Sequence, residues 1–120
     1  MSDMAFTAEQ LQAHNDVATS IAQENVDSDK VGIALPVIIA IISGALPIIG
    51  KLMSLCGGSP ASLRTKRTAP GVIRRSVRQS AREQGHKLRE WQVAELAEAI
   101  HAKANATSED EVNAMFARPE

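Results

Sequence analysis

The residues best suited to a chemical role are cations gathered in the middle of the chain. Positions 64 to 89 hold seven Arg and two Lys against a single Glu, a local net charge of +8. Cations at this density neutralise phosphates, either those of lipid headgroups or those of a nucleic-acid backbone. The candidate contact residues, one of them aromatic, are Arg64, Lys66, Arg67, Arg74, Arg75, Arg78, Arg82, Lys87, Arg89 and Trp91.

The spacing of these cations favours an amphipathic helix. Arg74, Arg78 and Arg82 recur at steps of four, which places them on one stripe of a helix, and apolar residues from Ile73 to Trp91 form a second stripe. A basic amphipathic helix is typical of segments that lie on an anionic membrane, with Trp91 as an interfacial anchor. Nucleic acid and an acidic protein segment are the other partners that this charge allows, although no base-reading motif accompanies it.

Residues that commonly carry catalysis do not form a constellation. The three histidines, His14, His86 and His101, stand apart without the spacing of metal ligands. Cys56 is the only cysteine, which excludes an intrachain disulfide. The sequence also lacks a nucleophile elbow and a glycine-rich phosphate loop. We therefore expect no enzyme activity, no cofactor and no metal site.

A long apolar segment precedes the cations. Residues 31–50 read VGIALPVIIAIISGALPIIG, with eleven Ile, Leu or Val and no charge before Lys51. A helix of this length spans about 30 Å, the thickness of a bilayer's hydrocarbon core. The sequence predicts a membrane segment over 31–55 that crosses the bilayer once. Two alternatives stay open: a re-entrant or surface-inserted segment, and a core helix that partner proteins bury.

Small residues and prolines recur through this segment at steps of three and four, the period of an α-helix. Small side chains let helices approach closely in lipid, where tight packing drives association. The pattern predicts a helix-packing stripe with the isoleucines turned toward lipid. The stripe consists of Gly32, Pro36, Ala40, Ser43, Pro47 and Gly50.

The flanking segments are expected to be helical but thin in apolar residues. Thr7 and Gln10 form a capping box that opens the first helix. The expected segments are an acidic N-terminal part over 1–30 with a helix about 8–24, a Gly/Pro/Ser linker over 56–70, a basic then acidic helix over 71–104 with a bend near 85, and a short capped helix over 108–120.

Together these patterns predict an all-α protein in which a single transmembrane or membrane-inserted helix is flanked by amphipathic helices, without a compact soluble core. Residues 1–30 carry six acids and one Lys, whereas the segment after the apolar run is basic. Cationic flanks stay on the cytoplasmic side of a membrane. We therefore expect the N-terminus outside and the C-terminus in the cytoplasm or in a virion interior.

The order of a polar start, a span and a charged tail is similar to that of small one-span proteins of viruses with an internal lipid membrane, and to that of holins. Holins end in a short polar tail, whereas 65 residues follow residue 55 here. We expect a non-enzymatic structural or assembly element, such as a virion membrane component, that contacts the bilayer, other subunits or itself, and nucleic acid through its basic arm. The alternatives are a membrane-permeabilising oligomer and a soluble helical adaptor whose apolar segment is buried in a protein complex.

Overall fold

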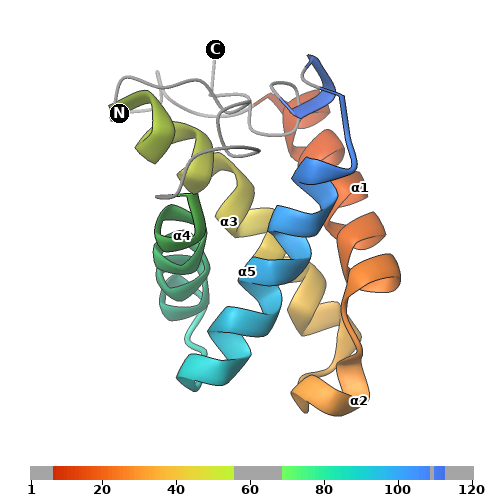
Figure 1. Cartoon of the computed structure of the whole chain (residues 1–120), viewed down its shortest axis with the longest axis vertical. Coiled ribbons are helices and arrows are strands. Elements are labelled where there is room, and N and C mark those ends of the chain that lie inside the picture. Colours follow the sequence, from red (N-terminus) through yellow and green to blue (C-terminus); the bar gives the residue numbers. More distant parts are fainter. Residues whose placement is uncertain (1–6, 56–68, 109, 113–120) are drawn as a thin grey trace.

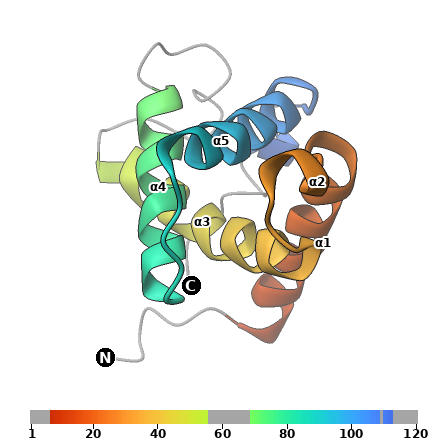
Figure 2. The same cartoon turned by 90° about the horizontal axis from the view of Figure 1, so that it is seen from below.

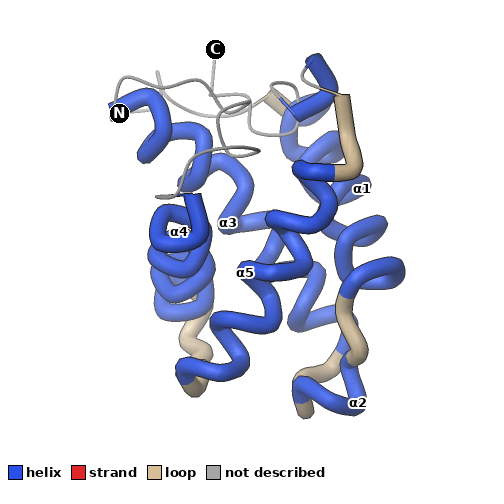
Figure 3. The backbone as a smooth tube through the Cα atoms, viewed as in Figure 1, coloured by secondary structure: helices blue, strands red, loops and turns tan. Residues whose placement is uncertain are grey.

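The computed structural model describes residues 7–55, 69–108 and 110–112, and within these ranges it contains helices and no strands (Figure 3). The predicted all-α class is therefore confirmed. The helices are α1 (Ala8–Asn25), α2 (Ser28–Val31), α3 (Leu35–Leu55), α4 (Ala69–Glu83) and α5 (Glu90–Asn105).

The four long helices form a bundle in which successive helices run in alternating directions (Figure 1). Helix α3 lies between α1 and α4 and packs extensively against both. Helix α5 packs against α4 and α1 and lies opposite α3, as the view along the bundle in Figure 2 shows. The outer side of α3 is therefore the side that faces away from α5.

Local capping explains where the first helices begin and end. Thr7 Oγ1 accepts from Gln10 N at 3.1 Å, and Gln10 Oε1 accepts from Thr7 N at 2.9 Å, which is the expected capping box. The Asp27 carboxylate caps α2 by accepting from two backbone N–H groups. Gly32 ends α2 with φ at 75°, a left-handed conformation that favours glycine. The apolar helix consequently starts at Leu35, four residues later than Val31.

The segment expected to be one helix over 71–104 is two helices. His86 N donates to Ala81 O at 2.8 Å and Gly85 N donates to Arg82 O at 3.1 Å, the pair of bonds of a Schellman motif. Gly85 has φ at 79°, which the motif requires. The chain therefore reverses at this glycine instead of bending, and α5 returns along α4.

The expected absence of a compact core is not what the structure shows. Buried apolar residues from α1, α3, α4 and α5 form one cluster. The apolar stripe of each flanking helix is narrow, but the large side chains of α3 complete one core with the apolar residues of all three helices. Four of the six isoleucines of α3 are thus buried against the chain's own helices, whereas Ile39 and Ile48 are half-buried. The largest fully buried side chains are Ile21, Ile38, Ile41, Ile42, Leu46, Ile49, Ile73, Leu96 and Ile100.

Two expected segments fall mostly outside the described residues. The linker over 56–70 does so apart from Ala69 and Pro70, which lie in the first turn of α4. Of the short helix over 108–120, the structure describes the start. There, Ser108 Oγ accepts from Glu111 N at 3.3 Å, the bond expected of its cap.

Candidate functional site

The structure places most of the predicted helix-packing stripe on the outer side of α3. Pro36 and Ala40 are exposed, Ser43 and Pro47 are half-buried, and Gly50 is buried. Gly32 departs from the prediction, because it lies outside α3 in the turn that ends α2. We use the name α3 outer face for Pro36, Ala40, Ser43 and Pro47.

The α3 outer face carries no charge from Pro36 to Pro47, and the exposed Lys51 follows one turn later. Residues Leu35–Met53 are long and apolar enough to cross a bilayer, a test that core helices of soluble proteins also pass. Only 39% of the residues in this stretch are buried inside the bundle. By contrast, the outer sides of α1, α4 and α5 carry exposed charges such as Glu9, Arg75 and Glu98. Helix α3 therefore has the least charged outer side of the four long helices, whereas the exposed large apolar side chains, Leu11 and Trp91, lie on α1 and α5.

A close contact between α3 and α4 holds the apolar helix in the bundle. Ser80 Oγ donates to Ile41 O at 2.7 Å, and Gln84 Nε2 donates to Ala40 O at 3.0 Å. Gly44 permits this approach, because a Cβ on residue 44 would collide with Ser80 Oγ. Sequence reasoning missed the contact. The available signal was a serine on the otherwise apolar stripe of α4, together with a glycine between Ser43 and Ala45.

The arginines of α4 lie toward α5 and toward solvent. Arg78 binds Glu90 in a bidentate ion pair, with Nε–Oε1 at 3.1 Å and Nη2–Oε2 at 2.8 Å. Hydrogen bonding from Arg78 lowers the pKa of the Glu90 carboxyl, and the same bond raises the pKa of Arg78. Arg74 lines a small hollow of about 50 Å³ with Ala94 and Ala97 of α5. Arg75 is exposed.

The two predicted sites therefore do not share one face. The side of α4 that contacts α3 carries Ser80 and Gln84, whereas Arg74 and Arg78 lie on the side toward α5. Bringing both sites to one membrane requires α3 to move relative to α4.

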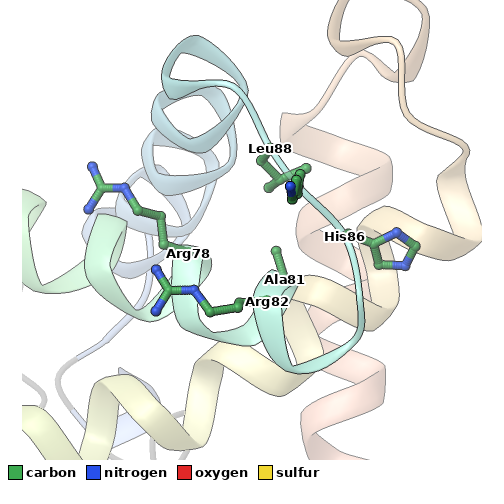
Figure 4. Close-up of a pocket in the computed structure, with 6 residues that line it drawn as sticks. Arg78, Ala81, Arg82, His86 and Leu88 are labelled. Atoms are coloured by element: carbon green, nitrogen blue, oxygen red, sulfur yellow. The ribbon is translucent and has the colours of Figure 1, made fainter.

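Several of the predicted cations meet at the turn between α4 and α5. A cavity of about 410 Å³ opens there. Its lining residues are Arg78, Ala81, Arg82, His86, Lys87 and Leu88 (Figure 4).

Arg89 and Trp91, two further predicted contact residues, do not line this cavity. Arg89 is the residue before α5, and its backbone N–H donates to Gln92 Oε1 at 2.8 Å. Trp91 is 47% exposed on the first turn of α5. Three further cations, Arg64, Lys66 and Arg67, lie outside the described residues.

Polar contacts tie the N-terminal helices to α5. Lys103 Nζ lies 3.3 Å from Glu24 Oε2, and Ser20 Oγ donates to the same carboxylate oxygen. The bond from Ser20, followed by that from Lys103, lowers the pKa of Glu24. Gln92 Nε2 donates to Val31 O at 3.1 Å. Among the described residues, no group of His, Cys, Asp and Glu has the arrangement of a metal site.

A comparison with models of protein families finds no match, and comparisons with curated proteins and with solved structures also find none.

Proposed function

We propose that this chain is a non-enzymatic, membrane-associated helical protein that acts as a structural or assembly element, with α3 as its membrane-entering helix. The observation that carries the proposal is the α3 outer face. No charge interrupts residues 35–50, and fewer than half of the residues in the stretch long enough to span a bilayer are buried. An outer helix face of this composition is typical of a surface that lipid or another protein covers.

The bundle is compatible with entry of α3 into a bilayer. Lipid tails are as apolar as a protein core, so Ile38, Ile41 and Ile49 exchange one apolar environment for another. Two losses oppose this step. The hydrogen bonds from Ser80 and Gln84 are worth about 0.5–1.5 kcal/mol each, and the apolar side chains of α1 and α5 lose their burial against α3. Helix α4 would then lie on the membrane surface with its apolar side down and its arginines at the lipid phosphates.

A role for the small-residue stripe follows from the same step. Once α3 is in lipid, the stripe from Pro36 to Gly50 offers a close-packing face for a second copy or another subunit. The distribution of charge predicts that the basic segment stays in the cytoplasm or virion interior, with residues 1–30 on the other side.

A soluble adaptor is the second candidate, and the closed hydrophobic core favours it. Helices α1, α4 and α5 already bury one side of α3. In this candidate another protein covers the α3 outer face, and lipid has no part in the function.

Liposome flotation distinguishes the two candidates. We expect the full chain to float with vesicles and to stay with them in high salt and in alkaline carbonate. Loss of flotation in carbonate would contradict an inserted α3 and favour the adaptor. A dye-leakage assay on the same vesicles separates an assembly element, which inserts without release, from a permeabilising oligomer.

A matched pair of variants makes this test specific for α3. Ala40 and Ala102 are both exposed helical residues, on α3 and α5 respectively. Ala40→Glu should reduce carbonate-resistant flotation about tenfold or more, because an acid inside a membrane helix costs about 2.5–3.5 kcal/mol at its centre and less toward its ends. Ala102→Glu should leave flotation unchanged. Equal behaviour of the two variants would contradict the assignment of α3.

A further inference from the structure

We propose that the cavity at the turn between α4 and α5 is a binding site for a phosphate group, which a lipid headgroup or a free phosphate compound supplies. This site would add a specific phosphate contact to the proposed binding of the basic helix to anionic lipid. The inference rests on the proposed function only if a lipid supplies the phosphate. The cavity volume of about 410 Å³ lies within the range of pockets that hold small molecules.

The charge of the lining is one-sided. Arg78 and Arg82 lie on successive turns of α4, Lys87 follows in the turn, and none of the described residues that line the cavity is acidic. Figure 4 shows the two arginines extending from α4 and Leu88 on the returning chain, while the His86 ring points away from the arginines. Ala81 and Leu88 give the cavity an apolar wall. The arrangement matches a ligand with one strongly anionic group and an apolar part.

Two of these cations are available to a ligand. Within the part of the chain that the structure describes, Arg82 and Lys87 are exposed and form no ion pair or side-chain hydrogen bond. Cations often complement the carbonyl end of a helix. Here, however, the backbone N–H groups of Gly85 and His86 already satisfy carbonyls in the last turn of α4. The cations are therefore not needed as caps.

Glu90 shows how an oxyanion binds at the edge of this site. Its carboxylate takes both Arg78 Nε and Nη2, the fork geometry that a phosphate also uses. A phosphate carries more charge than a carboxylate and would also reach Arg82 and Lys87. Glu90 is therefore an internal competitor for Arg78, and a ligand must displace it or share the guanidinium with it.

The shape favours a single phosphate over a polynucleotide. Proteins that bind single strands use a basic groove that follows the backbone, with aromatic side chains on which bases stack. Here the cations meet at one cavity, and the aromatic residue nearest in sequence, Trp91, does not line it. The test therefore also measures binding of a nucleic acid.

The test is a calorimetric titration of the full chain with inorganic phosphate at an ionic strength of about 0.15 M, which suppresses long-range attraction. We expect saturable binding. Arg82→Gln and Lys87→Gln should each weaken it about tenfold through loss of a charge-assisted hydrogen bond. Arg75→Gln is the matched control, because Arg75 lies on α4 about 10 Å along the axis from Arg82 and outside the cavity. Its effect should stay below about twofold.

Glu90→Gln tests the competition for Arg78. Removal of the competitor should strengthen phosphate binding about threefold to tenfold, because Arg78 becomes free for the ligand. Circular dichroism of each variant confirms that the fold is kept. Absence of saturable phosphate binding would overturn the proposal, as would equal weakening by Arg75→Gln and Arg82→Gln. Single-stranded DNA that binds more tightly than phosphate with equal dependence on Arg75 and Arg82 would also overturn it.

Vesicle flotation distinguishes a lipid headgroup from a free phosphate compound as the source of the phosphate. It also distinguishes failure of this site from failure of the proposed function. Phosphatidic acid in phosphatidylcholine vesicles should increase flotation in a manner that Arg82→Gln abolishes if a lipid is the source. Binding of inorganic phosphate with no such increase identifies a free phosphate compound and still supports the site. Carbonate-resistant flotation on neutral vesicles without phosphate binding supports the proposed function and refutes this site.

Discussion

Substituting Gly44 by Ala tests the contact that holds α3 against α4. A Cβ on residue 44 would collide with Ser80 Oγ and lie 3.0 Å from Gln84 Nε2. Overpacking costs about 1–3 kcal/mol, and displacement of Ser80 loses its bond to Ile41 O, about 0.5–1.5 kcal/mol. Alanine recovers about 1 kcal/mol through its higher helix propensity. We therefore expect Gly44→Ala to lower the free energy of unfolding by about 1–3 kcal/mol.

The matched control is the same substitution at Gly71 in α4. A Cβ there meets no atom of the described residues within 4 Å. Gly71→Ala should leave stability unchanged or raise it by up to about 1 kcal/mol. The sign of the effect therefore differs between two helical glycines that receive the same methyl group.

Ser80→Ala completes a double-mutant cycle. It removes the oxygen with which the new methyl group collides, and the Cβ of residue 80 would lie 3.5 Å away, an ordinary contact. In the Ser80→Ala background, Gly44→Ala should lower the free energy of unfolding only slightly. The coupling free energy between the two substitutions should therefore be about 1–2 kcal/mol. Urea unfolding of the four proteins, followed by far-UV circular dichroism without lipid, measures it. A destabilisation that Ser80→Ala leaves unchanged, or the same sign for Gly44→Ala and Gly71→Ala, would refute the packing of α3 on α4.

Three further predictions concern stability in the same buffer. Ile42→Ala should lower the free energy of unfolding by about 2–5 kcal/mol because Ile42 is fully buried, and a loss below about 1 kcal/mol in urea unfolding would contradict a closed core. Gly85→Ala should cost about 1–2 kcal/mol because φ is 79° there, whereas an unchanged urea midpoint would mean that α4 and α5 are continuous. Glu24 has a lowered pKa in the fold, so its contribution is full above its ordinary value of 4.5 and is lost as the pH falls through the folded value. The stability difference between the wild type and Glu24→Gln should accordingly shrink in acid, and a difference independent of pH would contradict the pairing with Ser20 and Lys103.

Local signals in the sequence determined most of the helical structure. The capping residue Thr7 marks the start of α1, and apolar periodicity identifies the helical parts of the later chain. The sequence predicted a bend near Gly85 instead of a reversal, and no break at Gly32. Gly32 and Gly85 are both in the left-handed conformation, but a glycine within a helical pattern is also compatible with an uninterrupted helix. Whether the chain reverses there depends on the helices that pack on either side.

The way in which the helices combine was less accessible from the sequence. Taken separately, α1, α4 and α5 have apolar stripes too thin to form a core, which favoured helices without one. In the bundle these stripes share the isoleucines of α3, and a long apolar helix serves as the core of its neighbours. The cavity at the turn was also inaccessible, because Arg78 and Leu88 meet across it only when α5 returns along α4.

The inner and outer sides of α3 show why periodicity does not identify a helix's partner. The small residues and the isoleucines form two stripes, and each is a credible packing face. In lipid the small stripe is the better contact, because close approach drives association there. In water the isoleucines are the better contact, since burial of apolar area dominates. The bundle follows the second rule and leaves Pro36 and Ala40 outside. Under the proposed function, the same helix would follow the first rule in a bilayer. The flotation of Ala40→Glu compared with that of Ala102→Glu tests whether α3 enters lipid, and equal flotation of the two variants would leave only the packing that suits water.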